Sequence, residues 1–143
     1  MKNDFTLTFE NGMPKGTAQQ KGECIRHKVV NGKRVAYIHH YKKAQVSTMR
    51  QELELKLKRY RPKTPSEAPI CLVAVFCFDV KDRKLWGKRK ATRADCSNLI
   101  KELEDAMTAV GFWKDDGQIV DLNVTKYYTE QAQILIHWEE VEP

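Results

Sequence analysis

The sequence has no long apolar run, and this absence argues against a membrane-spanning helix. Its longest apolar stretch, Pro69–Phe78, covers ten residues, whereas a membrane helix needs about 18 or more. The N-terminal residues lack the apolar core of a secretion signal. There is no internal repeat and no low-complexity segment. With 41% hydrophobic residues and a mean hydropathy of −0.61, we expect a soluble globular chain located in the cytoplasm.

Cysteines are few, and they form no recognisable metal-binding pattern. The four are Cys24, Cys71, Cys77 and Cys96. There is no C-x-x-C pair and no histidine pair at zinc-site spacing. Because no secretion signal is present, we interpret the cysteines as reduced thiols. Cys71 and Cys77 are an even number of residues apart in a predicted strand, so we expect them to share one face as small buried side chains.

Three stretches in the first 80 residues have the pattern of strands or of a hairpin. Asp4–Glu10 alternates apolar and polar residues, as a half-buried strand does. Val29–Val35 carries an Asn-Gly pair between apolar residues, which is a strong signal for a two-residue hairpin turn. Ile70–Phe78 is almost wholly apolar and rich in β-branched residues, which predicts a central strand. We interpret residues 11–23 as a loop.

Two stretches repeat apolar residues at helical spacing. The first, Ala44–Tyr60, has a basic outer face and is followed by prolines that end it. The second starts with Asp95 or Ser97 as its N-cap and continues to about Val110. The glycine that follows, at position 111, stands where a C-terminal glycine cap is expected.

The C-terminal residues predict two antiparallel strands, 118–127 and 131–138, joined by a turn near 128–130. The order β, hairpin, α, β, α, β, β then indicates an α+β fold with a mixed sheet and two main helices packed on it. A chain of 143 residues suits one domain. We therefore assign residues 1–143 to a single domain and treat the basic stretch 81–93 as a candidate mobile loop.

Charge is distributed very unevenly along the chain. The formal net charge is +6, which favours an anionic partner, with nucleic acid first. Residues 1–101 hold 23 basic and 9 acidic residues, whereas residues 102–143 hold 2 basic and 10 acidic ones. The stretch 81–93 alone has a net charge of +6. A charged stretch is usually a solvated loop, but this one leads into a carboxylate motif, so we predict that it binds DNA phosphates. Its cations are Lys81, Arg83, Lys84, Lys88, Arg89, Lys90 and Arg93.

Acidic residues flank the second predicted helix. Asp95 lies at its start, and Asp115 and Asp116 follow its end. Each has an ordinary structural interpretation, as a helix cap or as a turn. Together, beside a basic stretch, they are what a magnesium-dependent phosphodiesterase needs, because Mg²⁺ prefers carboxylate oxygens and activates water. Lys101, about 120° around the helix from Asp95, is a candidate to flank such a site and stabilise charge on the phosphate.

These residues belong to a longer motif. Arg93–Lys101 has the sequence R-A-D-C-S-N-L-I-K, and Gly111–Asp121 has the sequence G-F-W-K-D-D-G-Q-I-V-D. The combination resembles the RusA family of Holliday junction resolvases, whose pattern is a basic loop, D-x-D/S/T-N-L-x-K on a helix, then G-(F/I)-x-x-D-D-x-x-V. The resemblance is close from Arg93 to about Lys126 and weaker over the rest of the chain.

The resemblance implies a homodimeric, Mg²⁺-dependent endonuclease, with Mn²⁺ as an alternative ion. Such an enzyme binds four-way DNA junctions and nicks two strands symmetrically in recombination and repair. By their places in the motif, Asp95 and Asp116 correspond to the family's catalytic, metal-binding carboxylates, with Asp115 beside them. Lys101 corresponds to its catalytic lysine and Asn98 to its helix asparagine. Small resolvases of this kind are often carried by phages, so a prophage origin is a further expectation.

Ser97 departs from the best-known members of the family, which have a second aspartate at this position. It brings no charge to a metal site, and Asp115 or a water molecule is the candidate to fill the gap. Two alternatives therefore stay open. One is a non-catalytic protein that binds branched DNA. The other is a basic structural domain of a larger assembly, in which the three aspartates serve only as cap and turn.

Overall fold

The predicted apolar strand forms the interior of the main sheet. In the computed structural model, which describes residues 3–15, 21–42 and 48–143, this strand is β4 (Ile70–Asp79). The four-stranded sheet has the order β1-β6-β4-β5. β4 pairs in parallel with β5 (Ile119–Thr129) and antiparallel with β6 (Gln133–Glu140), while β1 (Asp4–Thr8) pairs antiparallel with the other edge of β6. The mixed sheet of the predicted α+β class is therefore confirmed.

One sequence prediction about the C-terminal strands is wrong. Strands β5 and β6 run in opposite directions, as expected, but β4 lies between them and pairs with both. The reason is the composition of β4, which has apolar residues on both faces and is best buried with a strand along each edge. The turn after Thr129 therefore carries the chain across the end of β4 instead of closing a hairpin.

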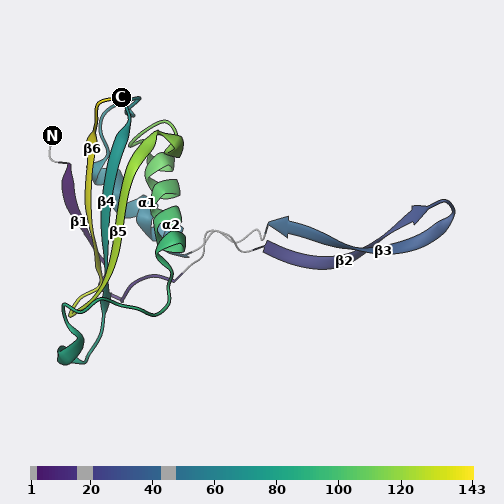
Figure 1. Cartoon of the computed structure of the whole chain (residues 1–143), viewed down its shortest axis with the longest axis horizontal. Helices are drawn as coiled ribbons and strands as arrows, with labels where there is room; N and C mark the ends of the chain where they lie inside the picture. Colours follow the sequence, from purple (N-terminus) through teal and green to yellow (C-terminus); the bar gives the residue numbers. More distant parts are fainter. Residues whose placement is uncertain (1–2, 16–20, 43–47) are drawn as a thin grey trace.

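Two helices cover one face of this sheet, as Figure 1 shows. They are α1 (Thr48–Leu57), which continues into a 3-10 turn η1 (Lys58–Tyr60), and α2 (Cys96–Val110). Their apolar stripes and one face of β4 bury a single core. The fully buried side chains include those of Trp113, Phe112, Leu103 and Phe76. We expected the first helix to begin at Ala44; residues 43–47, including Val46, lie outside the described residues.

Helix α2 ends where the sequence predicts. Gly111 adopts a left-handed conformation with φ of 98°, which a residue with a Cβ rarely takes. Its N–H donates to the carbonyls of Met107 and Thr108, both at 3.2 Å, and the N–H of Phe112 donates to Met107 at 3.0 Å. These bonds satisfy the last carbonyls of the helix. They also turn the chain sharply, so that Phe112 and Trp113 enter the core immediately after the helix.

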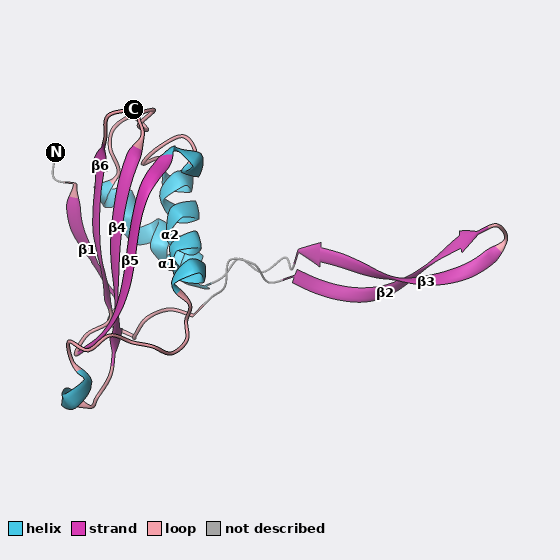
Figure 2. Ribbon diagram, in the orientation of Figure 1, coloured by secondary structure: helices cyan, strands magenta, loops and turns pink. Residues whose placement is uncertain are grey.

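The Asn-Gly signal is confirmed as a long hairpin outside the main sheet (Figure 2). Strands β2 (Lys21–Val30) and β3 (Lys33–Lys42) pair over their whole length and form a separate two-stranded sheet. Asn31 and Gly32 take φ of 51° and 75°, as the turn requires. The predicted loop 11–23 is therefore too long at its C-terminal end, because residues 21–23 already belong to β2.

The sheet face opposite the helices carries the two strand cysteines. Cys71 and Cys77 share that face, as the even spacing predicts, but only Cys77 is buried and Cys71 is half-buried. Burial raises the pKa of both thiols above the usual range. Every cysteine the structure describes is a free thiol. Among the described residues, no helix is long and apolar enough to cross a membrane.

Candidate active site

Asp95 occupies the position just before helix α2, and its side chain does not cap the helix. Its backbone is extended, with φ of −73° and ψ of 143°, and its carbonyl accepts the N–H of Leu99 at 3.0 Å. The side chain makes no capping hydrogen bond and is exposed. The structural interpretation of this aspartate as a cap therefore accounts for its backbone but not for its carboxylate.

Lys126 holds the residues that precede Asp95. From strand β5, its ammonium group donates to the carbonyls of Thr92 and Ala94, both at 2.7 Å. The bonds fix the direction in which the chain enters α2. This role was not predicted from the sequence. The sequence feature that could have drawn attention to Lys126 is its rarity, because it is one of only two basic residues after position 101.

The basic stretch 81–93 lies against the end of β5. The N–H of Gly87 donates to the carbonyl of Tyr128 at 2.8 Å, and the N–H of Tyr128 donates to the carbonyl of Lys88 at 2.9 Å. The backbone N–H of Lys90 donates to the backbone carbonyl of Lys126 at 3.0 Å. These bonds place the stretch at the same end of the sheet as Asp95, which its own connection to α2 also requires.

This packing leaves the cationic side chains of the stretch exposed. Six of the seven are exposed, and only Lys90 is half-buried, with its ammonium group 4.8 Å from the ring centroid of Phe78. Trp86 is half-buried and donates from its indole N–H to the carbonyl of Val80 at 2.8 Å. It therefore serves to shape the loop. Within the described part of the chain, no carboxylate forms an ion pair with these seven cations.

Asp115 and Asp116 form the turn that leads into β5. Asp115 is exposed and precedes the 3-10 turn η3 (Asp116–Gln118), whereas Asp116 is half-buried. The amide oxygen of Gln118 accepts the N–H of Asp115 at 2.9 Å. Its amide nitrogen donates to the carbonyls of Ser66 and Ala68, both at 2.9 Å. The turn is thus attached to the segment that precedes β4.

Asp95 and Asp116 therefore lie at opposite ends of helix α2. The 15 residues of α2 span roughly 22 Å at 1.5 Å per residue. The positions along β5 indicate the same separation. The turn η3 leads into Ile119 at the start of β5, whereas the residue before Asp95 is bonded to Lys126. Lys126 is seven residues, or roughly 23 Å, further along the strand than Ile119. Figure 1 shows α2 running alongside the sheet between these two ends. The two aspartates do not meet within one chain.

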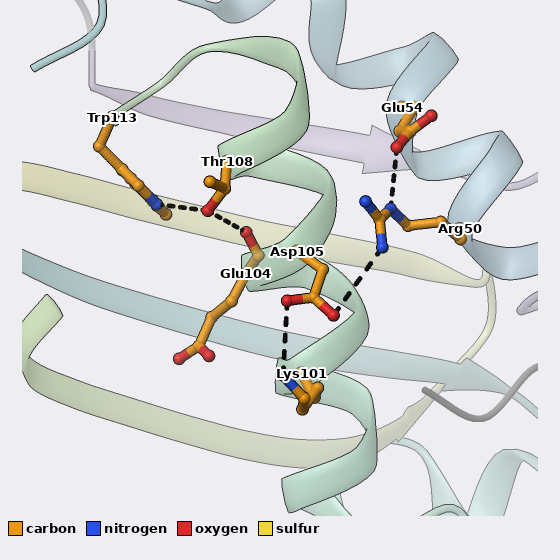
Figure 3. A network of polar contacts seen from close by, with 7 residues as sticks. All are labelled: Arg50, Glu54, Lys101, Glu104, Asp105, Thr108 and Trp113. Carbon is orange, nitrogen blue, oxygen red and sulfur yellow. Dashed lines mark hydrogen bonds and ion pairs between the residues drawn. The ribbon is translucent and has the colours of Figure 1, made fainter. Parts of the chain in front are cut away.

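Lys101 lies between these ends in a small network of charges (Figure 3). Its ammonium group is 3.5 Å from the carboxylate of Asp105, one turn further along α2. Arg50 of helix α1 approaches the same carboxylate at 3.8 Å and forms a 2.8 Å ion pair with Glu54. The network joins the two helices, and 40% of the Lys101 side chain remains exposed.

Glu104 brings a further carboxylate toward the Asp116 end. In Figure 3 its carboxylate points to a different side of α2 from that of Asp105. Burial raises the pKa of the Glu104 carboxyl, the negative charge of Asp116 raises it further, and Lys101 opposes the shift. A site role for Glu104 was not predicted from the sequence. The signal that could have indicated it is the spacing of three residues between Lys101 and Glu104, which places them side by side on a helix.

Ser97 and Asn98 lie in the first turn of α2, beside Asp95. Ser97 is exposed and Asn98 is half-buried. Among the described residues, no group of three or more histidine, cysteine, aspartate or glutamate side chains is arranged to hold a metal ion. Of the three predicted ligands, Asp115 and Asp116 are neighbours, and the length of α2 separates both of them from Asp95.

Comparison with known proteins places this arrangement in a family. The chain matches the family described as endodeoxyribonuclease RusA over residues 14–139. It is 34% identical over 139 residues to the crossover junction endodeoxyribonuclease rusA of Lactococcus phage r1t, covering 96% of this chain and 98% of that protein. It is 28% identical over 127 residues to the uncharacterized protein YqaN of Bacillus subtilis, covering 81% and 86%.

A shorter match of higher identity links the chain to a bacterial enzyme. It is 53% identical over 34 residues to the crossover junction endodeoxyribonuclease RusA of Escherichia coli K12, which covers 24% of this chain and 28% of that protein. The family match spans most of the chain, and the phage relative is similar along nearly its full length. The chain therefore belongs to the RusA family of endodeoxyribonucleases, and the resemblance found in the sequence is confirmed.

Proposed function

We propose that this chain is a Holliday junction resolvase, an endonuclease that recognises four-way DNA junctions and nicks them in recombination and repair. The observation that carries the proposal is the family match over residues 14–139, together with the full-length similarity to a phage crossover junction endodeoxyribonuclease. Because such DNA lies in the cytoplasm of a bacterial host, we propose that the enzyme acts there.

The surface near Asp95 supports a DNA substrate. Residues 81–93, which carry six exposed cations, lead directly to Asp95, an exposed residue whose side chain makes no capping hydrogen bond. Phosphates would bind to these cations, and counterion release would make the affinity fall steeply as salt rises. We propose that this surface delivers the scissile phosphate to Asp95.

We further propose a homodimer in which each cutting site uses both chains. Cutting two symmetric strands requires two sites related by a two-fold axis. Within one chain, Asp95 and Asp116 are held apart by α2. In the proposed dimer, the Asp116 end of one chain lies against the Asp95 end of its partner. The two-fold axis then creates two equivalent sites, and each site combines Asp95 of one chain with Asp116 of the other.

Magnesium is the proposed cofactor, with manganese as the alternative. Carboxylate oxygens are its preferred ligands, and it would supply an activated water and positive charge at the phosphate. Asp95, Asp116 and Asp115 are the proposed ligands of the assembled two-chain site. Lys101 would stabilise negative charge that develops on the phosphate, and Ser97 and Asn98 would contact the site through hydrogen bonds.

A cleavage assay tests the proposed function. The protein is incubated with a synthetic four-way junction and with linear duplex of the same sequence, each with Mg²⁺ and with EDTA. We expect paired nicks in the junction alone and only with the metal. Asp95→Asn and Asp116→Asn should bind the junction without cutting it. Cutting at the normal rate by either variant would contradict the proposed site.

One alternative has a specific observation in its favour. Ser97 replaces a second aspartate, so the chain has one carboxylate fewer than the best-known members at this position. Tight junction binding with no cutting under any divalent metal would identify a non-catalytic branched-DNA binding protein. Equal binding to branched and linear DNA would instead favour a structural domain of a larger assembly.

A further inference from the structure

The β2–β3 hairpin is the part of the structure that the proposed site does not use. It pairs with no strand of the main sheet. Every residue from Ile25 to Ile38 is exposed, on both faces of the ribbon. Ordinary hairpins of this length pack one face against a core, because two strands alone bury little. A ribbon exposed on both faces is available to a partner.

The charge of the hairpin indicates what kind of partner fits. Between Glu23 and Glu52 the sequence has no acidic residue and seven lysines and arginines. Four of these cations lie in the exposed part of the ribbon, which therefore carries four positive charges and no negative one. They are Arg26, Lys28, Lys33 and Arg34. A phosphate backbone is the complementary surface.

The strand register places three of these cations on one face. Arg26 is opposite Tyr37, Lys28 is opposite Val35, and Lys33 is opposite Val30. Because side chains alternate along a strand and paired residues share a face, Arg26, Lys28 and Lys33 point to the same side. The ammonium group of Lys28 lies 5.3 Å from the ring centroid of Tyr37 on that side.

The dimensions of the ribbon suit a DNA duplex. Each strand has ten residues, which extend roughly 34 Å, close to one turn of B-form DNA. The major groove is about 12 Å wide and admits a two-stranded β-ribbon. The same face carries exposed apolar side chains, Val30 at 44% and Val35 at 41%, which in a groove would lie against base methyl groups or sugars.

We propose that the β2–β3 hairpin is a second DNA-binding element, which lies along the duplex arm of the junction and contacts its phosphates through Arg26, Lys28 and Lys33. The inference rests on the proposed function, since it takes branched DNA as the substrate. Because the ribbon contains no proposed cutting residue, it contributes to affinity for the DNA and leaves the rate of the cutting step unchanged.

A charge-matched pair of variants tests this role. One carries Arg26→Gln, Lys28→Gln and Lys33→Gln. The other carries Lys15→Gln, Lys58→Gln and Lys63→Gln, which removes three exposed lysines outside both the hairpin and residues 81–93. Binding of a labelled four-way junction is measured in EDTA over a series of salt concentrations, and cutting with Mg²⁺ is measured at saturating protein.

We expect the hairpin variant to bind about tenfold or more weakly at 0.1 M salt, with a slope of log affinity against log salt that is smaller by about 3. The control variant should bind much more tightly than the hairpin variant, and saturated cutting should equal the wild type in both. An unchanged affinity and slope in the hairpin variant would overturn the proposal. If the wild-type protein itself did not bind the junction, that result would contradict the proposed resolvase function, on which the role of the hairpin depends.

Two further measurements separate direct contact from an effect on assembly. Lysine acetylation followed by mass spectrometry should detect protection of Lys28 and Lys33 by junction DNA, with Lys58 and Lys63 unprotected. Sedimentation of the DNA-free protein should give the same mass for the wild type and the hairpin variant. A change in mass that accompanies the loss of affinity would instead assign the ribbon to contact with a second copy, and would overturn the proposal.

Discussion

Asp95 and Asp116, the two aspartates that the family motif assigns to the metal, stand at opposite ends of helix α2. The 15 residues of α2, which extend roughly 22 Å, lie between them in the chain. Lys126 is bonded to the residue before Asp95, and Gln118 attaches the turn that contains Asp116 to the segment before β4. A metal site that uses both aspartates would therefore require the proposed dimer.

Subunit mixing tests that requirement. Asp95→Asn and Asp116→Asn homodimers should each be inactive. In a mixed dimer with sites shared between chains, one site contains both substitutions and the other contains neither. We therefore expect the mixed dimer to regain one active site and to nick a single strand. The measurement is strand-specific cleavage of a labelled four-way junction.

The control for mixing is a dimer of wild-type and Asp95→Asn chains, which retains one intact site in either arrangement. If that control cuts DNA while the dimer of one Asp95→Asn chain and one Asp116→Asn chain stays inactive, both aspartates act within one chain. That result would contradict the proposal of a site shared by two chains.

Replacing Lys101 should slow cutting without weakening DNA binding. In Lys101→Met, the aliphatic part of the side chain is retained and the positive charge is lost. Removal of one group that stabilises transition-state charge costs about 10²- to 10³-fold in rate. Single-turnover cleavage at saturating protein measures the effect, and junction binding in EDTA provides the control. An unchanged rate would remove Lys101 from the mechanism.

Lys126 is expected to affect both stability and cutting, although it carries no proposed chemistry. Lys126→Met removes two charge-assisted hydrogen bonds to the backbone before Asp95. The free energy of unfolding should fall by about 1 to 3 kcal/mol, and cutting should decrease because Asp95 is less well positioned. Urea unfolding and single-turnover cleavage measure the two effects. Lys58→Met, at an exposed position of η1, should change neither. Equal stability of the two variants would contradict the role of Lys126.

Glu104 should make the protein less stable as the pH rises. The folded-state pKa of Glu104 is raised, mainly by burial and then by Asp116. The native state thus binds the proton more tightly than the unfolded state, and stability is lost as the pH rises from the ordinary glutamate range through the raised pKa. Glu104→Gln removes this loss. We expect its melting temperature to exceed that of the wild type slightly at pH 7 and to approach it at low pH.

The matched control for Glu104 is Asp105→Asn, on the same helix but paired with Lys101 and Arg50. Its substitution should lower the melting temperature at pH 7, because it removes a favourable interaction. A Glu104→Gln protein that is less stable than the wild type at pH 7 would contradict the electrostatic argument.

Features that depend on neighbouring residues could be predicted from the sequence. The Asn-Gly turn, the apolar strand β4, the stripe of α2 and its glycine cap follow from φ preference and from periodicities of two and 3.6 residues. The family motif likewise lies within about thirty contiguous residues. Local chemistry was sufficient for the fold class and for the candidate aspartates.

Only the tertiary structure decided which distant residues meet. The sequence could not place β4 between β5 and β6, because strand pairing depends on burial of the whole sheet. Nor could it show that Lys126 bonds to Ala94, 32 residues earlier, since a side chain's partner across a sheet depends on register. The separation of Asp95 from Asp116 has the same origin. Their closeness along the motif suggested one site within one chain, whereas helix α2 lies between them in the structure, which is why we propose a site shared by two chains.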